Sequence, residues 1–417
     1  MDVVGVAATR AAAPLAAGAP HPASVVAGFP TRNEVSTVRQ VVDVVEEGLC
    51  RAGWAGCAVL VNADNGSSDG TPAAFGAAPG RIRKLTIATG ADGTGKGTNV
   101  LAIFRAALDM GAERVAVFDA DVRSIEPGWA GAMLDAVEGN APAMAVPVYR
   151  RNRYEGNTTN HIASPLLAAV LGVQVQQPIA GDFAFNRGFV ERALTWPLPE
   201  SAQLYGIDIH LTGSAAREGF RIAQVPLGRK IHNPGFPKIL FMSQQVIDSA
   251  FHVIARAGHP RPAPAAPHGP RATVDTAVMR PEAALVERTL AQVRAYLAQQ
   301  RAAIGCLFPS LDDAVWARDG LAVVDAPAWG EVLADALAAV AAGRAVEARD
   351  HLVALYLCRV MTYWDEIERL DDPAAIDAAL DVQTAAVIRA VARRRGLELT
   401  VAPPMALSPG AWAGGPL

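Results

Sequence analysis

The sequence is poor in cysteine, carries no excess of positive charge and lacks long apolar runs. Its four cysteines, Cys50, Cys57, Cys306 and Cys358, do not have the close paired spacing of a zinc site or a thioredoxin-like redox motif. Its 37 lysine and arginine residues are outnumbered by 41 aspartate and glutamate residues, so no basic field is available for nucleic acid or anionic lipid. No stretch reaches the roughly 18 uninterrupted apolar residues of a transmembrane helix. We therefore expect a cytoplasmic protein without a nucleic-acid partner or a transmembrane segment.

The 417 residues, 51% of them hydrophobic, are enough for one large core and two structural units. A proline-rich run, HPRPAPAAPHGPR, at residues 259–271 is unsuited to a helix or a central strand and predicts a linker. Apolar residues recur at helical spacing beyond it, which predicts an all-helical region. We expect a disordered arm at 1–22, an α/β domain at 23–258, a linker at 259–280, a helical domain at 281–402 and a flexible tail at 403–417.

Three apolar runs before the predicted linker each end in a polar cluster. The runs at 24–29, 58–61 and 114–118 predict buried strands, and helical periods lie between them. Strands alternating with helices predict a mostly parallel sheet, which binds its ligands at the carboxyl ends of the strands. We therefore expect the clusters at 30–34, 64–71 and 119–121 to converge on one crevice.

Asp119-Ala120-Asp121 is the cluster with the clearest chemistry. Alternate residues of an extended segment can aim two carboxylates at one small volume, and hard oxygen ligands of this kind suit Mg²⁺ or Mn²⁺. Such an ion could also bind the phosphates of a nucleotide diphosphate and neutralise the charge that develops as it leaves. A solvated pair of turn acids is the alternative, and it is the commoner origin of a bare D-x-D.

Two further clusters are ambiguous by themselves. The Gly-Lys-Gly run at 95–97 places Lys96 between two flexible residues before a predicted helix, where the ammonium could meet a phosphate or simply face solvent. In the cluster at 30–34, Asn33 and Glu34 could cap and start a helix rather than bind a ligand. Each cluster gains weight only beside the others.

Two single side chains also admit two interpretations. His232 follows a short basic run and could be an ordinary surface or core histidine rather than a ligand. Asp208 could be an acid at the start of a helix with no catalytic duty. Composition decides neither case.

Taken in order, these motifs resemble those of the retaining GT-A glycosyltransferases, the family of mannosylglycerate synthase and glucosyl-3-phosphoglycerate synthase. The resemblance extends from residue 25 to about residue 257, and a fainter one covers the helical region, where the run at 359–363 looks like mannosylglycerate synthase. Seven markers in one order are more specific than any one of them. They are residues 30–34, 64–71, 95–97, 119–121, the run Gln-Pro-Ile-Ala-Gly-Asp at 177–182, the run Gly-Ile-Asp at 206–208, and His232.

The resemblance implies a GT-A fold, which is a Rossmann-like α/β domain with a mostly parallel sheet, followed here by an all-helical region. It also implies that Asp121 and His232, assisted by Asp119, bind Mg²⁺ or Mn²⁺ as a cofactor. Asp208 would orient the acceptor hydroxyl and, with Lys96 near the donor, would carry the catalysis. The residues expected to bind the nucleotide-sugar donor are Pro30, Glu34, Asn65, Lys96, Asp119 and Ile179. Those expected to bind the acceptor are Asn157, Thr158, Thr159, Asp208 and Arg150.

Two departures from the family pattern bear on the substrates. The family's Gln-Pro-Leu-Gly-Gly-Glu is here Gln-Pro-Ile-Ala-Gly-Asp, so one glycine gains a methyl group and the acid is a methylene shorter. The acceptor loop of the phosphoglycerate enzymes carries Gly-Arg-x-Thr, whereas residues 156–159 are Gly-Asn-Thr-Thr, and asparagine cannot make the bidentate contact of arginine with a phosphate. A carboxylate-bearing acceptor such as D-glycerate is therefore favoured over 3-phosphoglycerate, although Arg150, Arg151 and Arg153 lie just upstream and could reach either anion.

Three functions remain open on the sequence alone. The first is a retaining transferase that moves glucose or mannose, for example from UDP-glucose or GDP-mannose, to make a glycosylglycerate-type compatible solute. The second is an inverting family-two-type transferase for a cell-surface glycan, which shares the clusters at 30–34 and 64–71 but needs a general base. The third is a non-catalytic nucleotide-sugar-binding protein, suggested by Ala180 and Asp182. The helical region could cap the acceptor site or form a homodimer.

Overall fold

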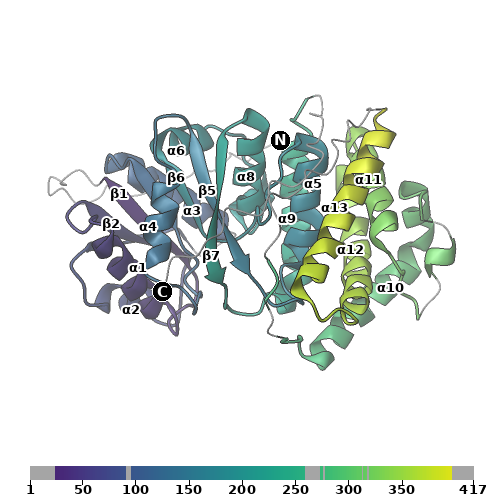
Figure 1. The fold of residues 1–417 in the computed structure, drawn as a ribbon, viewed down its shortest axis with the longest axis horizontal. Coiled ribbons are helices and arrows are strands. Elements are labelled where there is room, and N and C mark those ends of the chain that lie inside the picture. Colours follow the sequence, from purple (N-terminus) through teal and green to yellow (C-terminus); the bar gives the residue numbers. More distant parts are fainter. Residues whose placement is uncertain are drawn as a thin grey trace, which may run out of the picture.

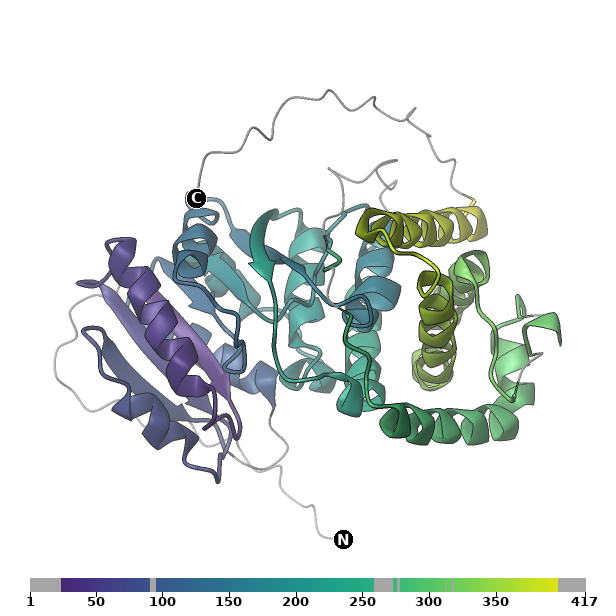
Figure 2. The same cartoon turned by 60° about the horizontal axis from the view of Figure 1, so that its bottom comes forward.

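A computed structural model describes residues 24–90, 95–258, 273–275, 278–311, 313–316 and 319–396 of the chain. The predicted arm at 1–22 and tail at 403–417 lie outside the described residues, as does most of the predicted linker. A unit built around a β-sheet occupies one side of the molecule, and helices from the C-terminal third occupy the other (Figure 1). Figure 2 shows the same two parts beside each other after rotation.

The described residues contain seven strands, which form one sheet in the order β3-β2-β1-β4-β6-β5-β7. Parallel pairing joins β1 to β2 and β4, β2 to β3, and β5 to β7, whereas β6 runs antiparallel to β4 and β5. This mostly parallel sheet, interleaved with helices and followed by helices, confirms the predicted fold class. The strands are β1 (Val25–Thr31), β2 (Ala58–Asp64), β3 (Arg83–Ala88), β4 (Arg114–Val117), β5 (Ala143–Arg150), β6 (Phe183–Asn186) and β7 (Arg221–Arg229).

Helices connect the strands and then continue alone to the end of the described chain. Those of the sheet unit are α1 (Val38–Arg51), α2 (Thr71–Ala77), α3 (Lys96–Asp109), α4 (Gly128–Asp135), α6 (Arg187–Ala193), α7 (Glu200–Gln203), α8 (Ile207–Glu218) and α9 (Ile239–Ile254). Between β5 and β6 lie the π-helix η1 (Thr159–Ala163), α5 (Ser164–Leu166) and the π-helix η2 (Leu167–Leu171). The remaining elements are the 3-10 helices η3 (Phe236–Lys238) and η4 (Asp313–Trp316), and α10 (Ala283–Leu307), α11 (Ala326–Ala341), α12 (Ala345–Ile367) and α13 (Pro373–Arg394).

Burial explains why the first strand and helix form where they do. Strand β1 pairs on both edges, and its apolar residues Val25, Val26 and Phe29 are fully buried, as expected for a central parallel strand covered on both faces. Helix α1 buries its periodic apolar residues, including Val38 and Val45, against the sheet. This strand-turn-helix unit leaves the residues that follow β1 at the carboxyl edge of the sheet.

A second hydrophobic core joins the C-terminal helices to segments that precede the predicted linker. Ile162 and Leu166 in the insertion between β5 and β6, and Phe251 of α9, belong to the same buried cluster as Leu355 of α12. The indole nitrogen of Trp329 in α11 donates a hydrogen bond of 2.7 Å to the carbonyl of His161 in η1. The insertion and α9 lie between the sheet and the C-terminal helices in Figure 1. The second core therefore contains residues from both sides of the predicted linker.

A short described piece of the predicted linker lies beside the end of β5. Arg151 forms a parallel bridge with Val274, donates its backbone N–H to the carbonyl of Thr273 (2.8 Å) and accepts from the N–H of Asp275 (2.7 Å).

In the part of the chain that the structure describes, no helix has both the length and the apolar character needed to cross a membrane.

Candidate active site

A cavity of about 830 Å³ opens at the carboxyl ends of the parallel strands, within the usual size range of small-molecule sites. It is lined by residues that follow β1, β2, β4, β5 and β7, so the predicted polar clusters do converge on one crevice. Every candidate residue proposed from the sequence lines this cavity except Arg150. Those that do are Pro30, Glu34, Asn65, Lys96, Asp119, Asp121, Asn157, Thr158, Thr159, Ile179, Asp208 and His232.

The loops after β1 and β2 are bonded to each other and form one wall of the cavity. Asn33 adopts a left-handed backbone conformation (φ 59°), accepts a hydrogen bond from the N–H of Ser68 (2.9 Å) and donates its own N–H to Ser67 Oγ (2.8 Å). Helix α1 begins only at Val38, so the alternative in which Asn33 caps that helix is wrong. The N–H of Glu34 donates to Thr71 Oγ1 (2.8 Å), and Glu34 lines the cavity.

Lys96 lies between the D-x-D loop and Asp208. Its ammonium is 2.9 Å from Asp119 Oδ1 and 3.2 Å from Asp208 Oδ1, and it donates to the carbonyl of Gly181 at 3.2 Å. Burial lowers the pKa of Lys96, but the two carboxylates outweigh burial and hold that pKa above its ordinary value. Burial raises the pKa of Asp208, with Lys96 opposing it. Two acidic side chains and one cation thus meet where three separate segments of the chain converge.

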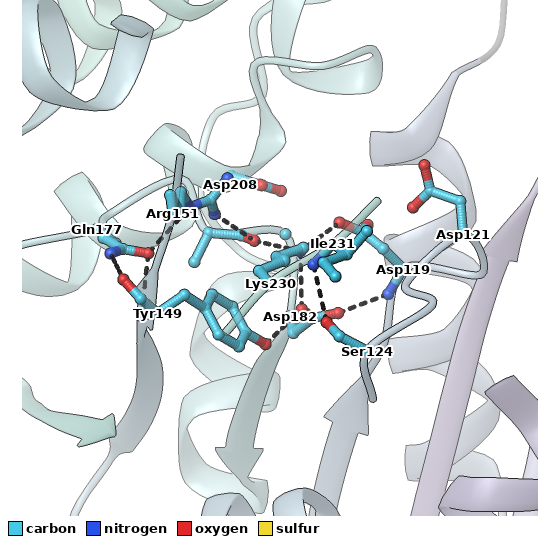
Figure 3. Close-up of polar contacts among 12 residues, drawn as sticks. Asp119, Asp121, Ser124, Tyr149, Arg151, Gln177, Asp182, Asp208, Lys230 and Ile231 are labelled. Carbon is cyan, nitrogen blue, oxygen red and sulfur yellow. Dashed lines mark hydrogen bonds and ion pairs between the residues drawn. The ribbon is translucent and has the colours of Figure 1, made fainter. Parts of the chain in front are cut away.

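Lys230 and Tyr149 are the members of this site that sequence reasoning missed. The Lys230 ammonium contacts Asp182 (2.8 Å), Asp119 (3.2 Å) and the carbonyl of Ala180 (2.8 Å), and it lies 5.1 Å from the centre of the Tyr149 ring (Figure 3). The Tyr149 hydroxyl donates to Asp182 at 2.6 Å. The only sequence signal was the basic run before His232, which by itself is equally typical of a solvated surface.

Asp182 fixes the position of the D-x-D loop. One of its carboxylate oxygens accepts the backbone N–H of Asp119 at 2.7 Å, while the other accepts from Tyr149 and Lys230. Gly181 has φ +94°, and a Cβ atom there would lie 1.9 Å from Asp119 Oδ2, so only glycine fits. The shortened acid of the 177–182 run is therefore a buried structural anchor of the site.

Hydrogen bonds join the loop that carries Asp121 to the segment that carries His232. Ser124 Oγ accepts the N–H of Ile231 (2.8 Å) and donates to the carbonyl of Arg229 (2.7 Å), and Asp121 Oδ2 accepts the N–H of Asn233 (3.2 Å). The segment that carries His232 is thus tied to the loop that carries Asp121. Figure 3 shows Asp121 at the edge of this network, away from Lys230.

The chemistry of this corner suits a divalent cation. Burial, with help from Lys230 and Arg151, lowers the pKa of His232 to about 3 and keeps its imidazole neutral, which is the form that binds metals. Burial and Asp119 raise the pKa of Asp121. Burial, with the charges of Asp121 and Asp119, raises the pKa of Glu34 to about 7. The negative charge gathered here would be relieved by a bound cation.

The site is nevertheless not a complete protein cage for a metal. Among the described residues, no three His, Cys, Asp or Glu side chains are grouped closely enough to hold an ion on their own. Both carboxylate oxygens of Asp119 are paired, one with Lys96 and the other with Lys230, and these lysines hold the pKa of Asp119 below its ordinary value against the effect of burial. Asp121 and His232, the other two side chains that the sequence analysis expects at a metal, line the same cavity.

Two of the residues predicted to bind the acceptor, Asn157 and Thr158, are hydrogen-bonded to side chains of helix α12. Asn157 accepts from the indole nitrogen of Trp364 (3.2 Å) and donates to the carbonyl of Tyr154 (2.9 Å), and Thr158 Oγ1 is 2.9 Å from the Tyr356 hydroxyl. Helix α12 therefore shapes this wall of the cavity.

The arginines upstream of that loop have different positions. Arg150 is exposed and does not line the cavity, whereas the next residue, Arg151, does. Arg151 donates to Gln177 Oε1 (3.2 Å) and to the carbonyl of Ala180 (3.4 Å). Arg153 is buried and donates to the carbonyl of Leu370 (2.8 Å). Of the three, Arg151 is the arginine that lines this cavity.

No family model and no curated protein matches the chain. Solved structures of glucosyl-3-phosphoglycerate synthase from Mycobacterium tuberculosis are similar to it. The complex of that enzyme with Mn²⁺, uridine diphosphate and phosphoglyceric acid shows 26% sequence identity and a TM-score of 0.45, covering 57% of this chain and 80% of that chain. The complex with Mg²⁺ and uridine diphosphate shows 23% identity and a TM-score of 0.44, covering 57% of this chain and 81% of that chain. These structures are of an enzyme in the family that the sequence motifs resemble.

Proposed function

We propose that this protein is a metal-dependent glycosyltransferase that moves a hexose, glucose or mannose, from a nucleotide-sugar donor to a hydroxyl group of a small acceptor. The observation that carries the proposal is the position of Lys96. Its ammonium joins Asp119 of the D-x-D loop to Asp208 inside a cavity of about 830 Å³. A diphosphate that leaves the sugar needs a cation beside it, and the acceptor hydroxyl needs an oriented polar partner. The two requirements meet at this lysine.

The donor would occupy the part of the cavity formed by the ends of β1, β2 and β4. Glu34 would meet the ribose and Asn65 the base, with Pro30 and Ile179 as further walls, since all four residues line the cavity. Asp121 and His232 would hold Mg²⁺ or Mn²⁺ together with the donor diphosphate, and the ion would supply Lewis-acid stabilisation of the departing charge.

Transfer breaks the bond between the anomeric carbon and the β-phosphate oxygen, and forms a bond from that carbon to the acceptor oxygen. The acceptor proton passes to the departing phosphate oxygen, so the products are a glycoside and a nucleoside diphosphate. Asp208 orients the acceptor hydroxyl on the same face as the leaving group, and Lys96 stabilises the phosphate charge as it develops. This front-face course retains the anomeric configuration.

Compact anionic acceptors are the first candidates to test. D-Glycerate and 3-phosphoglycerate each bring a carboxylate that could pair with Arg151, which lines the cavity where Arg150 does not. The bidentate donor geometry of arginine suits that group.

The test incubates the protein with Mn²⁺, one of the donors UDP-glucose, GDP-glucose or GDP-mannose, and one of the two acceptors. Nucleotide release, product mass and the anomeric configuration by NMR are recorded. Acceptor-dependent release with retained configuration is the expected result. An inverted product would instead make Asp208 a general base. Donor binding by calorimetry with no turnover across all pairs would favour the non-catalytic binder.

A further inference from the structure

One part of the cavity lining is apolar. It is formed by the first turns of α9 and by the segment that leads into α10. We call it the apolar wall and define it by six residues. They are Ile239, Phe241, Met242, Val246, Met279 and Leu285.

Two members of the apolar wall remain exposed to solvent. Phe241 is 55% exposed and Met279 is 52% exposed, although most large apolar side chains of the described residues are buried. Exposed apolar side chains that gather at a cavity mark a site for an apolar ligand group more often than scattered ones do. Phe241 lies in α9 and Met279 lies in the predicted linker, so two separate segments bring exposed apolar side chains to the lining of one cavity.

The apolar wall begins next to the proposed reaction centre. The ring of Phe241 lies 6.5 Å from the ring of Tyr205, edge to face. The backbone N–H of Tyr205 donates to Gln245 Oε1 at 2.9 Å, which fixes the turn that leads into α8 and Asp208. A group attached to a hydroxyl held by Asp208 can thus extend directly onto Phe241 without leaving the cavity.

Rigid aromatic packing supports this side of the cavity from behind. The ring of Trp364 in α12 lies 5.3 Å from that of Tyr154 and 5.6 Å from that of Phe236. The guanidinium of Arg280 lies over the Tyr154 ring at 5.2 Å and pairs with Glu368. The charge of Arg280 is therefore already paired with the Glu368 carboxylate and the Tyr154 ring.

Two polar side chains of the cavity lining, Asn157 and Thr158, are committed to internal contacts, while the exposed Lys238 and Glu282 also line the cavity. Asn157 is bonded to Trp364 and to the carbonyl of Tyr154, and Thr158 is bonded to Tyr356. A compact polyhydroxylated acceptor would leave hydroxyls against apolar side chains, and unpaired polar groups are costly when buried. A sugar acceptor would have the same difficulty.

We propose that the acceptor is an amphipathic hydroxy compound, whose reacting hydroxyl meets Asp208 while an apolar chain or ring covers the apolar wall. This inference rests on the proposed function for the identity of the reaction and deepens it by naming the acceptor class. D-Glycerate and 3-phosphoglycerate carry no apolar part, so they fill only the polar end of the cavity.

The experiment uses a homologous series of (R)-3-hydroxy acids from four to ten carbons, with D-glycerate as the reference without an apolar chain. With Mn²⁺ and the best donor, kcat/KM is expected to rise roughly fourfold per methylene until the wall is covered. Binding of each acid to the full chain is measured in parallel by calorimetry, without donor. The dissociation constant should fall along the series in the same order.

Two wall variants and one control test the location. Phe241→Ser and Met279→Ser are each expected to weaken binding of 3-hydroxydecanoate at least about fivefold and to flatten the dependence on chain length. Val346→Ser alters a valine that is 59% exposed on α12 and does not line the cavity. It should change neither the binding of 3-hydroxydecanoate nor the dependence on chain length. Because all three positions are exposed, the folded state should survive the substitutions.

The outcomes separate this inference from the proposed function. If D-glycerate, 3-phosphoglycerate or an oligosaccharide is the preferred acceptor and chain length has no effect, the inference is overturned while the transferase stands. If binding strengthens with chain length but no donor is turned over with any acceptor, the wall stands and the proposed function fails. If neither binding nor turnover depends on chain length, or if the wall variants behave like Val346→Ser, the apolar acceptor is ruled out.

Discussion

The ammonium of Lys230 lies 2.8 Å from a carboxylate oxygen of Asp182, and both side chains are almost completely removed from solvent, at 2% and 0% exposure. The other oxygen of Asp182 holds the backbone of Asp119. A buried ion pair thus positions the D-x-D loop before any ligand arrives.

Removing the cation of that pair should destabilise the protein strongly. Lys230→Met leaves the carboxylates of Asp182 and Asp119 without this partner in a buried setting. Breaking such a pair from one side typically costs about 3–5 kcal/mol of the free energy of unfolding. Urea titration followed by circular dichroism measures the change. The matched control is Lys238→Met, which alters an exposed lysine at the same cavity and should cost less than about 0.5 kcal/mol. Equal losses in the two variants would show that the pair has no special role.

Replacing Asp208 by asparagine should slow transfer without weakening donor binding. Asp208→Asn keeps the shape of the side chain but removes the charge that faces Lys96 and the acceptor hydroxyl. We expect kcat to fall roughly 100-fold or more, because the hydroxyl loses its orientation. The donor dissociation constant, measured by calorimetry, should stay within about threefold of that of the wild type. Asp248→Asn is the control, since Asp248 pairs with Arg349 outside the cavity. A kcat for Asp208→Asn equal to that of the control would remove Asp208 from the mechanism.

The two side chains that we propose as metal ligands should determine how much Mn²⁺ donor binding requires. Asp121→Asn and His232→Gln are each expected to raise the Mn²⁺ concentration for half-maximal donor binding by about tenfold or more. The readout is calorimetric titration of the donor at a series of Mn²⁺ concentrations, which needs no turnover. His252→Gln changes a histidine that does not line the cavity and serves as the control. If both site variants need the same Mn²⁺ concentration as the wild type, Asp121 and His232 are not the metal ligands.

Much of the site was predictable because local patterns report strand ends. A continuous apolar run followed by a polar cluster places that cluster at the carboxyl edge of a parallel sheet, and this reasoning located Glu34, Asn65 and Asp119. Lys230 was missed because its carboxylate partners lie 48 and 111 positions away in the chain, where no short pattern connects them. Contacts of that kind are created by the antiparallel insertion of β6, which the alternation of strands and helices did not predict.

The choice between Arg150 and Arg151 depends on one residue of strand register. Adjacent residues of a strand face opposite sides, so a shift of one position exchanges the side chain that meets the cavity. Strand β5 carries such an irregularity, between Val148 and Tyr149, where its register with β7 changes. A bulge of this kind leaves little trace in composition, so the sequence analysis chose Arg150, the last residue of the strand, whereas Arg151, just after the strand, lines the cavity.

His161 should make the protein acid-labile. Burial, together with the nearby Arg359, lowers its pKa from 6.5 to about 3, while its ring bonds to Gln383 at 2.7 Å. Between pH 6.5 and about 3 the unfolded chain therefore binds a proton at His161 that the native state does not bind. The free energy of unfolding that the neutral imidazole contributes is fully present above pH 6.5 and is lost as the pH falls towards 3. His161→Asn should reduce the slope of unfolding free energy against pH by up to about 1.4 kcal/mol per pH unit between pH 6 and 4. Above pH 7 the slopes of wild type and variant should coincide. Identical slopes below pH 6 would mean that His161 is protonated in the native state.

A chain that ends at Gly258 should not reach a native state. It lacks α11, α12 and α13, which cover the apolar side chains of Ile162, Leu166 and Phe251 in the second core. We expect the truncated protein to bind a hydrophobic dye and to aggregate, in contrast to the full chain. A monodisperse product with a cooperative thermal transition would contradict the shared core.

The second core also sets the order of events during synthesis. Ribosomes add roughly 5–20 residues per second, so the insertion between β5 and β6 emerges roughly 9–35 s before α12, its partner in the core. During that interval the apolar side chains of the insertion lack the helices that cover them in the complete fold. Nascent chains stalled after α9 should therefore be degraded faster by added protease than chains stalled beyond α13, and equal resistance would mean that the first half folds alone.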